Sequence, residues 1–94
     1  MPTNITQIED SERGKTVLRV AGELMIEDAV LLEKIALDLR NNNGASLAID
    51  LADLNFMDSE SAPIVKRLRD KHGFEIEGLE FFLQKVVDRS ESRD

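Results

Sequence analysis

The run Leu47-Ala48-Ile49-Asp50-Leu51 constrains the fold of this chain most strongly, because four of its five residues are apolar. A strand with one face in water alternates apolar and polar residues, whereas a strand covered on both faces reads as a nearly continuous apolar run. We therefore expect residues 47–51 to form a central strand of a largely parallel sheet.

Three other segments carry apolar residues at the three- and four-residue spacing of a helix. The first extends from Glu27 to Arg40, the second follows Pro63 and ends at Gly73, and the third begins after Gly78. Asparagine, proline and glycine at these boundaries are typical of helix starts and stops. The sequence thus predicts three main helices.

Alternating apolar residues indicate the remaining strands. They occur around Ile5 and Ile8, over residues 16–21 and over residues 74–77. A turn-like stretch at 11–15 makes the first two an antiparallel hairpin. The expected order β-β-α-β-α-β-α gives one α/β domain over 1–94, with a mostly parallel sheet of about four strands, a core at 16–88 and a frayed tail at 90–94.

Composition excludes several classes of function. The chain has 94 residues, no cysteine and one histidine, His72, so disulfides, thiolate metal sites and schemes that need two imidazoles are ruled out. A net charge of −7 opposes non-specific binding to nucleic acid or anionic lipid. The amino-terminal residues show no export signal and no apolar run is long enough for membrane insertion, so we expect a cytoplasmic protein without cofactors.

Several short motifs match a known family. They are Val20-Ala21-Gly22-Glu23-Leu24, Ile49-Asp50-Leu51, Phe56-Met57-Asp58-Ser59 and the later Gly73. Over about Thr16 to Asp88 the chain resembles the STAS domain of bacterial anti-sigma factor antagonists, which act in signal transduction and transcription regulation by partner switching. The resemblance implies that an Asp-Ser-Ser-Gly turn at the start of the second helix carries a serine that a partner kinase phosphorylates. It also implies that the unphosphorylated form of the domain binds that partner.

This chain departs from the family at that turn, which reads Asp58-Ser59-Glu60-Ser61. Glu60 occupies the position of the phosphorylated serine and Ser61 that of the glycine. Glu60 either imitates the phosphorylated state, with less charge than a phosphoserine, or only benefits from the unpaired N–H groups at a helix start.

The other residues of the turn also have two interpretations. Ser59 and Ser61 are candidate phosphoacceptors or helix caps, and Ser61 is the favoured cap because Pro63 then lies at the second helical position. Asp58 either only fixes the turn through hydrogen bonds to nearby N–H groups or also presents the site to a partner.

Charge is segregated along the chain. Residues 22–60 contain nine acids and two bases, whereas the two flanking segments are neutral. Acids expected near the ends of the parallel strands are Glu23, Glu27, Asp28, Asp53, Asp58 and Glu60. The second helix is basic, with Lys66, Arg67, Arg69 and Lys71. Such a pattern is either an ordinary solvated surface or a bipolar docking surface that includes Lys66 and Arg69.

The leading hypothesis is a non-enzymatic module that binds a kinase-like anti-sigma factor or a related signalling protein through residues 58–68. The predicted binding residues are Asp58, Ser59, Glu60, Ser61, Lys66 and Arg69. One alternative is a cytoplasmic STAS subunit that binds the ATPase of a lipid-transport ABC system. Another is an enzyme that holds Mg²⁺ between Asp50, Asp53, Asp58 and Glu60 for phosphoryl transfer. Homodimer formation stays open.

Overall fold

The computed structural model describes residues 3–43 and 46–84. Its elements are β1 (Asn4–Asp10), β2 (Lys15–Leu24), α1 (Ile26–Asn43), β3 (Leu47–Asp50), β4 (Leu54–Met57), α2 (Ser61–Asp70) and β5 (Glu75–Glu77), and residues 79–84 are helical. The α/β class and the expected order are confirmed, with β4 as an additional short strand. The predicted core boundary at 88 and the predicted tail at 90–94 lie outside the described residues.

The sheet has five strands. Its order is β1-β2-β3-β5, with β1 antiparallel to β2 and the other neighbours parallel, so β3 is an interior strand as predicted. The first part of β2 pairs with β3, and its last part pairs with β4. The register shifts between Gly22 and Glu23, where Gly22 has a φ of 89°. The shift lies within the segment that pairs with β4, because Gly22 pairs with Leu54 and Glu23 pairs with Phe56.

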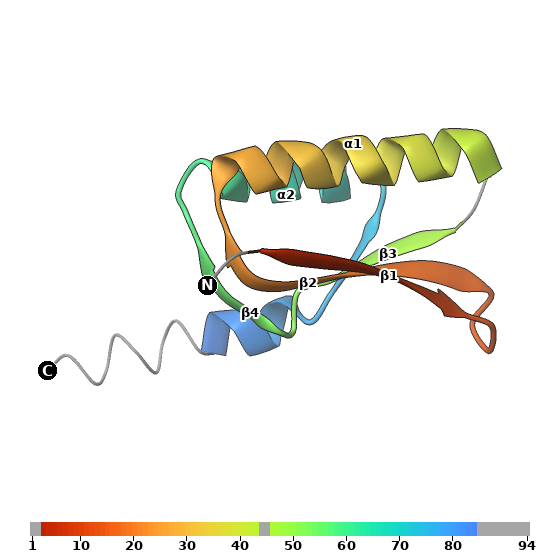
Figure 1. Cartoon of the computed structure of the whole chain (residues 1–94), viewed down its shortest axis with the longest axis horizontal. Helices are drawn as coiled ribbons and strands as arrows, with labels where there is room; N and C mark the ends of the chain where they lie inside the picture. The colour runs from red at the N-terminus through yellow and green to blue at the C-terminus, as the bar shows by residue number, and fades with distance from the viewer. Residues whose placement is uncertain (1–2, 44–45, 85–94) are drawn as a thin grey trace, which may run out of the picture.

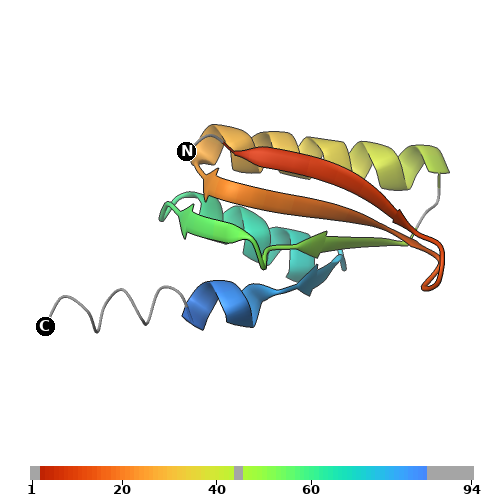
Figure 2. The same ribbon diagram turned by 60° about the horizontal axis from the view of Figure 1, so that its bottom comes forward.

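The two long helices, α1 and α2, cover one face of the sheet (Figure 1). Beneath them lies the hydrophobic core, which contains the fully buried Leu18, Ile49, Leu51 and Leu68. The short helical segment 79–84 lies beside β4, at the side of the sheet opposite β1 (Figures 1 and 2). Phe82, on this segment, is 6% exposed and joins the core.

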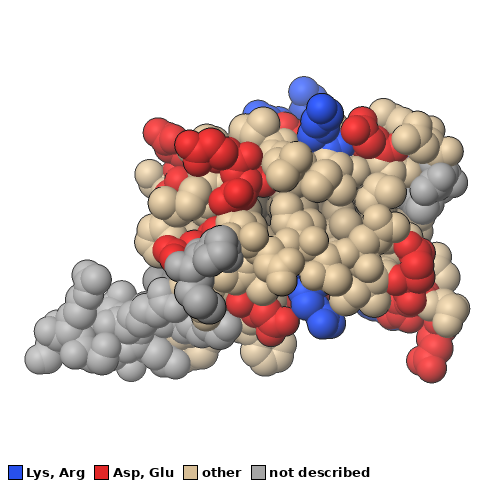
Figure 3. All heavy atoms as spheres, in the orientation of Figure 1, with Lys and Arg blue, Asp and Glu red and all other residues tan. Residues whose placement is uncertain are grey.

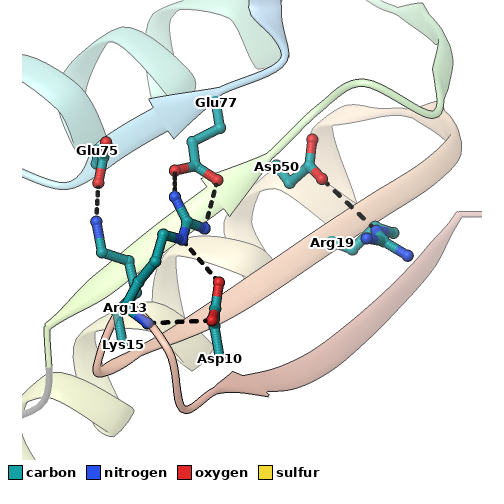
Figure 4. A network of polar contacts seen from close by, with 7 residues as sticks. All are labelled: Asp10, Arg13, Lys15, Arg19, Asp50, Glu75 and Glu77. Atoms are coloured by element: carbon teal, nitrogen blue, oxygen red, sulfur yellow. Dashed lines mark hydrogen bonds and ion pairs between the residues drawn. The ribbon is translucent and has the colours of Figure 1, made fainter.

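The other face of the sheet carries charged side chains instead of long helices (Figure 4). Arg13, in the β1–β2 turn, donates to both carboxylate oxygens of Glu77 at 2.6 and 3.1 Å and to Asp10 at 2.7 Å. These bonds hold the pKa of both carboxyls below their usual values. The turn between β1 and β2 is thereby tied to β5.

Two small apolar residues on this face are buried nevertheless. Val17 and Ala48 are paired between β2 and β3 and are 5% and 0% exposed. Long aliphatic stems of lysine and arginine can cover apolar surface while their charged ends stay in water. The run 47–51 is therefore mostly apolar although helices cover only one of its faces.

Gly78 and Gly73 form a matched pair that tests whether the chain at Gly78 packs closely against the backbone at Ala52. Both have a φ of 73°, but a Cβ at Gly78 would lie 2.5 Å from the backbone nitrogen of Ala52 and 2.7 Å from the Asp50 carboxylate. A Cβ at Gly73 would meet nothing within 4 Å. We predict that Gly73→Ala costs about 1 kcal/mol for the left-handed backbone alone, and that Gly78→Ala costs about 1–3 kcal/mol more. Urea denaturation measures both losses, and equal losses would contradict the close approach.

Candidate functional site at the start of α2

The Asp58 carboxylate contacts the starts of both long helices. Its Oδ1 accepts a hydrogen bond from the backbone N–H of Ser61 at 2.8 Å, and its Oδ2 accepts one from the backbone N–H of Ile26 at 3.0 Å. Ile26 is the first residue of α1 and Ser61 is the first residue of α2. The first N–H groups of a helix have no partner within the helix, so one side chain satisfies a donor in each.

The carbonyl of Leu24, at the end of β2, is the second anchor of the turn. It accepts hydrogen bonds from the backbone N–H of Asp58 at 3.1 Å and from the hydroxyl of Ser61 at 3.2 Å. Ser61 is 0% exposed. The β4–α2 turn is therefore fastened to the end of the neighbouring strand by backbone and side-chain bonds together.

The prediction that Ser61 caps α2 is wrong. The cap position belongs to Glu60, whose side chain makes no capping hydrogen bond, and Pro63 is the third helical residue. The Ser61 hydroxyl instead donates a second hydrogen bond to the Leu24 carbonyl, and Asp58 supplies the acceptor oxygen that a cap would supply. The missing N–H of Pro63 costs little, because the first turn has no intrahelical acceptor for it.

These hydrogen bonds also set the charge state of the turn. Bonds from Ser61, followed by backbone N–H groups including that of Ile26, hold the pKa of Asp58 below its ordinary value despite the opposing effect of burial. Asp58 is therefore ionised at neutral pH and faces the helix starts. The turn-fixing role expected for Asp58 is confirmed.

A groove lies beside this turn. It has a volume of about 410 Å³ and is lined by Met57, Asp58, Ser59, Ala62, Val65, Lys66, Arg69, Ile76, Leu79, Phe82 and Leu83. Four of the six residues predicted to bind a partner, namely Asp58, Ser59, Lys66 and Arg69, thus line one groove. Glu60 is exposed but does not line it, and the buried Ser61 supports the turn from inside.

The basic residues of α2 differ in their contacts: one forms an ion pair with α1, and two border the groove. Arg67 donates to both carboxylate oxygens of Glu33 at 2.7 and 2.6 Å, which ties α2 to α1 and lowers the pKa of Glu33. Arg69 pairs with its exposed neighbour Asp70 at 2.8 Å, and the side chain of Lys66 is exposed. Arg67 is thus a structural contact, whereas Lys66 and Arg69 border the groove.

The acidic residues form two groups instead of one. Figure 3 shows acidic atoms over the end of the molecule where α1 begins, and Glu27 and Asp28 belong to the first turn of that helix. Asp53 was expected there, but it lies in the β3–β4 turn, 3.8 Å from Arg19. Arg19 also pairs with Asp50 at 3.6 Å.

The magnesium site of the enzyme alternative is not assembled. Asp50 and Asp53 face Arg19, whereas Asp58 faces the helix starts. Over residues 3–43 and 46–84, no three histidine or acidic side chains are grouped so as to hold a metal ion. Within the same ranges, no helix is both long and apolar enough to cross a membrane.

The other half of the groove was not predicted. Met57, Ile76 and Leu79 line it, but Met57 was noted only as part of a family motif, and Ile76 and Leu79 only as part of a predicted strand and a predicted helix. Of the two adjacent phenylalanines, Phe82 is buried and Phe81 is 65% exposed, as the helical spacing predicts for neighbours. The roles of the Leu24 carbonyl and the Ile26 N–H have no signature in the sequence.

Replacing Asp58 by Asn should lower stability in a pH-dependent way. The variant loses one acceptor oxygen and the charge, so it should melt several degrees earlier than the wild type at neutral pH. Because the pKa of Asp58 is lowered on folding, its stabilising effect is complete above the unfolded-state pKa of about 3.9 and is lost as the pH falls through the lower folded value. The difference in Tm should therefore be constant above about pH 5 and shrink below about pH 4. A difference that does not change with pH would contradict this role.

Comparison with known proteins gives structural matches alone, since no protein-family model and no curated protein matches the chain. The STAS-domain antisigma-factor antagonist from Rhodobacter sphaeroides superimposes with a TM-score of 0.62, 18% identity and coverage of 88% of this chain and 94% of that one. An uncharacterized DUF3478-family protein with a SpoIIAA-like fold from Shewanella loihica superimposes with a TM-score of 0.58 and 20% identity, and the match covers 92% of this chain and 76% of that one. The anti-sigma factor antagonist SpoIIAA in its unphosphorylated form superimposes with a TM-score of 0.54 and 15% identity, and the match covers 96% of this chain and 98% of that one. The chain therefore has a STAS-like fold.

Proposed function

We propose that this chain is a non-enzymatic regulatory module that binds a protein partner at the start of α2. The observation that carries the proposal is the gathering of Asp58, Ser59, Lys66 and Arg69 around one groove. Bonds to Ile26 and Leu24 fix the turn, so a partner would meet a surface that is already ordered.

The proposed partner is a kinase-like anti-sigma factor or a related signalling protein in the cytoplasm. The support is the likeness of the fold to two anti-sigma factor antagonists, together with the family motifs around Asp50 and Asp58. The lack of cysteine is compatible with a reducing compartment.

Glu60 is proposed to take the place of the phosphorylated serine. Its side chain is exposed and makes no capping bond to α2, so its carboxylate is available to a partner. A glutamate provides a permanent negative charge where phosphorylation would provide a switchable one. Ser59 is exposed, whereas the buried hydroxyl of Ser61 is engaged with Leu24. Modification at Ser61 would therefore require this turn to open.

A second candidate is a subunit that regulates a lipid-transport ABC system. The observation that favours it is Glu60, because such a subunit needs no phosphorylatable serine at that position. Capture of partners from the host with the wild-type chain, followed by mass spectrometry, separates the two candidates. A kinase-like protein supports the first and a transporter ATPase supports the second.

Reversing the charges at the groove should slow association with the captured partner. We predict that Lys66→Glu combined with Arg69→Glu lowers the on-rate by about an order of magnitude at low salt, while the off-rate changes little. The control reverses Lys34 and Lys71, which are also exposed but do not line the groove, and so changes net charge equally.

Stopped-flow measurements over a salt series distinguish local from general electrostatic effects, because exposed charges are screened over about 8 Å at physiological salt. Equal on-rates for the groove variant and the control variant would contradict docking at this surface.

Glu60→Ser should restore modification. If the captured partner is a kinase, the purified variant should incorporate phosphate at position 60, and the wild type should incorporate none at that position. Intact-protein and peptide mass spectrometry measure the incorporation. Stoichiometric phosphate on Ser59 or Ser61 of wild-type protein from the host would contradict the proposal that this chain escapes phosphorylation.

A further inference from the structure

The groove beside α2 also has the polarity of a small-molecule site. We propose that it binds a single-chain amphiphile with an anionic head, of the class of the fatty acids. The proposal concerns the isolated chain and does not rest on the proposed protein partner.

The lining of the groove suits an aliphatic tail. Seven of its residues are apolar: Met57, Ala62, Val65, Ile76, Leu79, Phe82 and Leu83. The volume of about 410 Å³ falls in the range of small-molecule sites, roughly 300–1,000 Å³. A flexible hydrocarbon chain can occupy such a groove without placing an unsatisfied polar group against its lining.

The exposed fractions of the lining side chains indicate which of them a bound ligand would cover. Val65 and Phe82 are 7% and 6% exposed and belong to the hydrophobic core, so part of the lining is continuous with the interior. Leu83 also lines the groove but is 51% exposed. An apolar tail would remove this side chain from water, which is the main source of favourable free energy for such ligands.

Two cationic side chains border the groove on α2. Lys66 and Arg69 are three residues apart, a spacing that places them on one side of a helix. The exposed Asp70 accepts from Nε of Arg69 at 2.8 Å and from Nη2 at 3.4 Å, so Nη1 of Arg69 is not part of this pair. An ammonium and a guanidinium N–H can therefore donate to one anionic head group.

The acidic residue in the lining does not compete for this position. Both carboxylate oxygens of Asp58 accept hydrogen bonds from helix-start N–H groups, and Asp58 precedes α2. Lys66 and Arg69 belong to the middle and last turns of that helix. The charge distribution therefore orients the ligand, with its anionic head at Lys66 and Arg69 and its tail against the apolar lining.

The test compares two amphiphiles of equal chain length and opposite charge. Purified full-length chain is titrated calorimetrically with dodecanoate and with dodecyltrimethylammonium, each below its micelle concentration. We expect wild type to bind dodecanoate at least about tenfold more tightly. Lys66→Glu with Arg69→Glu should invert this preference, which damage to the fold alone would not do. The control variant, with Lys34 and Lys71 reversed, should keep the wild-type preference.

The position of the ligand is tested separately. Ala62→Trp places a large side chain from α2 into the groove and should abolish dodecanoate binding. NMR shift changes should centre on the backbone of Val65, Leu79 and Phe82. No saturable binding, equal affinity for both amphiphiles, a preference unchanged by the charge reversal, or shift changes centred elsewhere would overturn the proposal. A partner that still binds normally in any of these cases would leave the proposed function standing.

Discussion

One carboxylate, that of Asp58, joins the first turns of α1 and α2, and the position of the site depends on it. The parallel pairing of β2 with β4 places Leu24 opposite Met57, so the two strands end side by side. Each strand leads within a few residues into a helix, and both helix starts present unpaired N–H groups to the same space. A short acidic side chain immediately after β4 can reach both, which explains why aspartate suits position 58.

The groove follows from this junction. With the start of α2 fixed, one side of the helix packs Ile64 and Leu68 into the core, and its edge carries Lys66 and Arg69. The segment 79–84 supplies the facing wall and contributes Phe82 to the core. The core and the groove thus depend on the same contacts, because moving the helix start would change both.

The sequence predicts most of this architecture because periodicity reports burial directly. The hairpin, the three helices and the interior position of β3 follow from apolar spacing. The strand β4 is harder to predict, because it has four residues and depends on the register shift at Gly22. The bond of Ser61 to Leu24 depends on a carbonyl 37 residues away, which no local rule for helix caps describes.

The distribution of charge along the chain could be predicted from the sequence, but not which charged side chains form ion pairs in the folded structure. The excess of acids over residues 22–60 is visible in the sequence, and so is the basic character of α2. In the folded chain, the charge of Arg67 is neutralised by an ion pair with Glu33 on α1. Asp53 pairs with Arg19 and so lies apart from the acids at the start of α1. The charges left to act on a ligand or a partner are those that tertiary structure does not pair internally, foremost Lys66 at the groove.

The most direct test of this account follows the amide resonances of Ile26 and Ser61 by NMR while the pH is lowered. If the Asp58 carboxylate bonds to both, the two amide signals should shift together, with one midpoint that lies below the ordinary pKa of an aspartate, and both transitions should vanish in Asp58→Asn. Separate midpoints, or a response of only one amide, would contradict the claim that a single carboxylate holds the two helix starts.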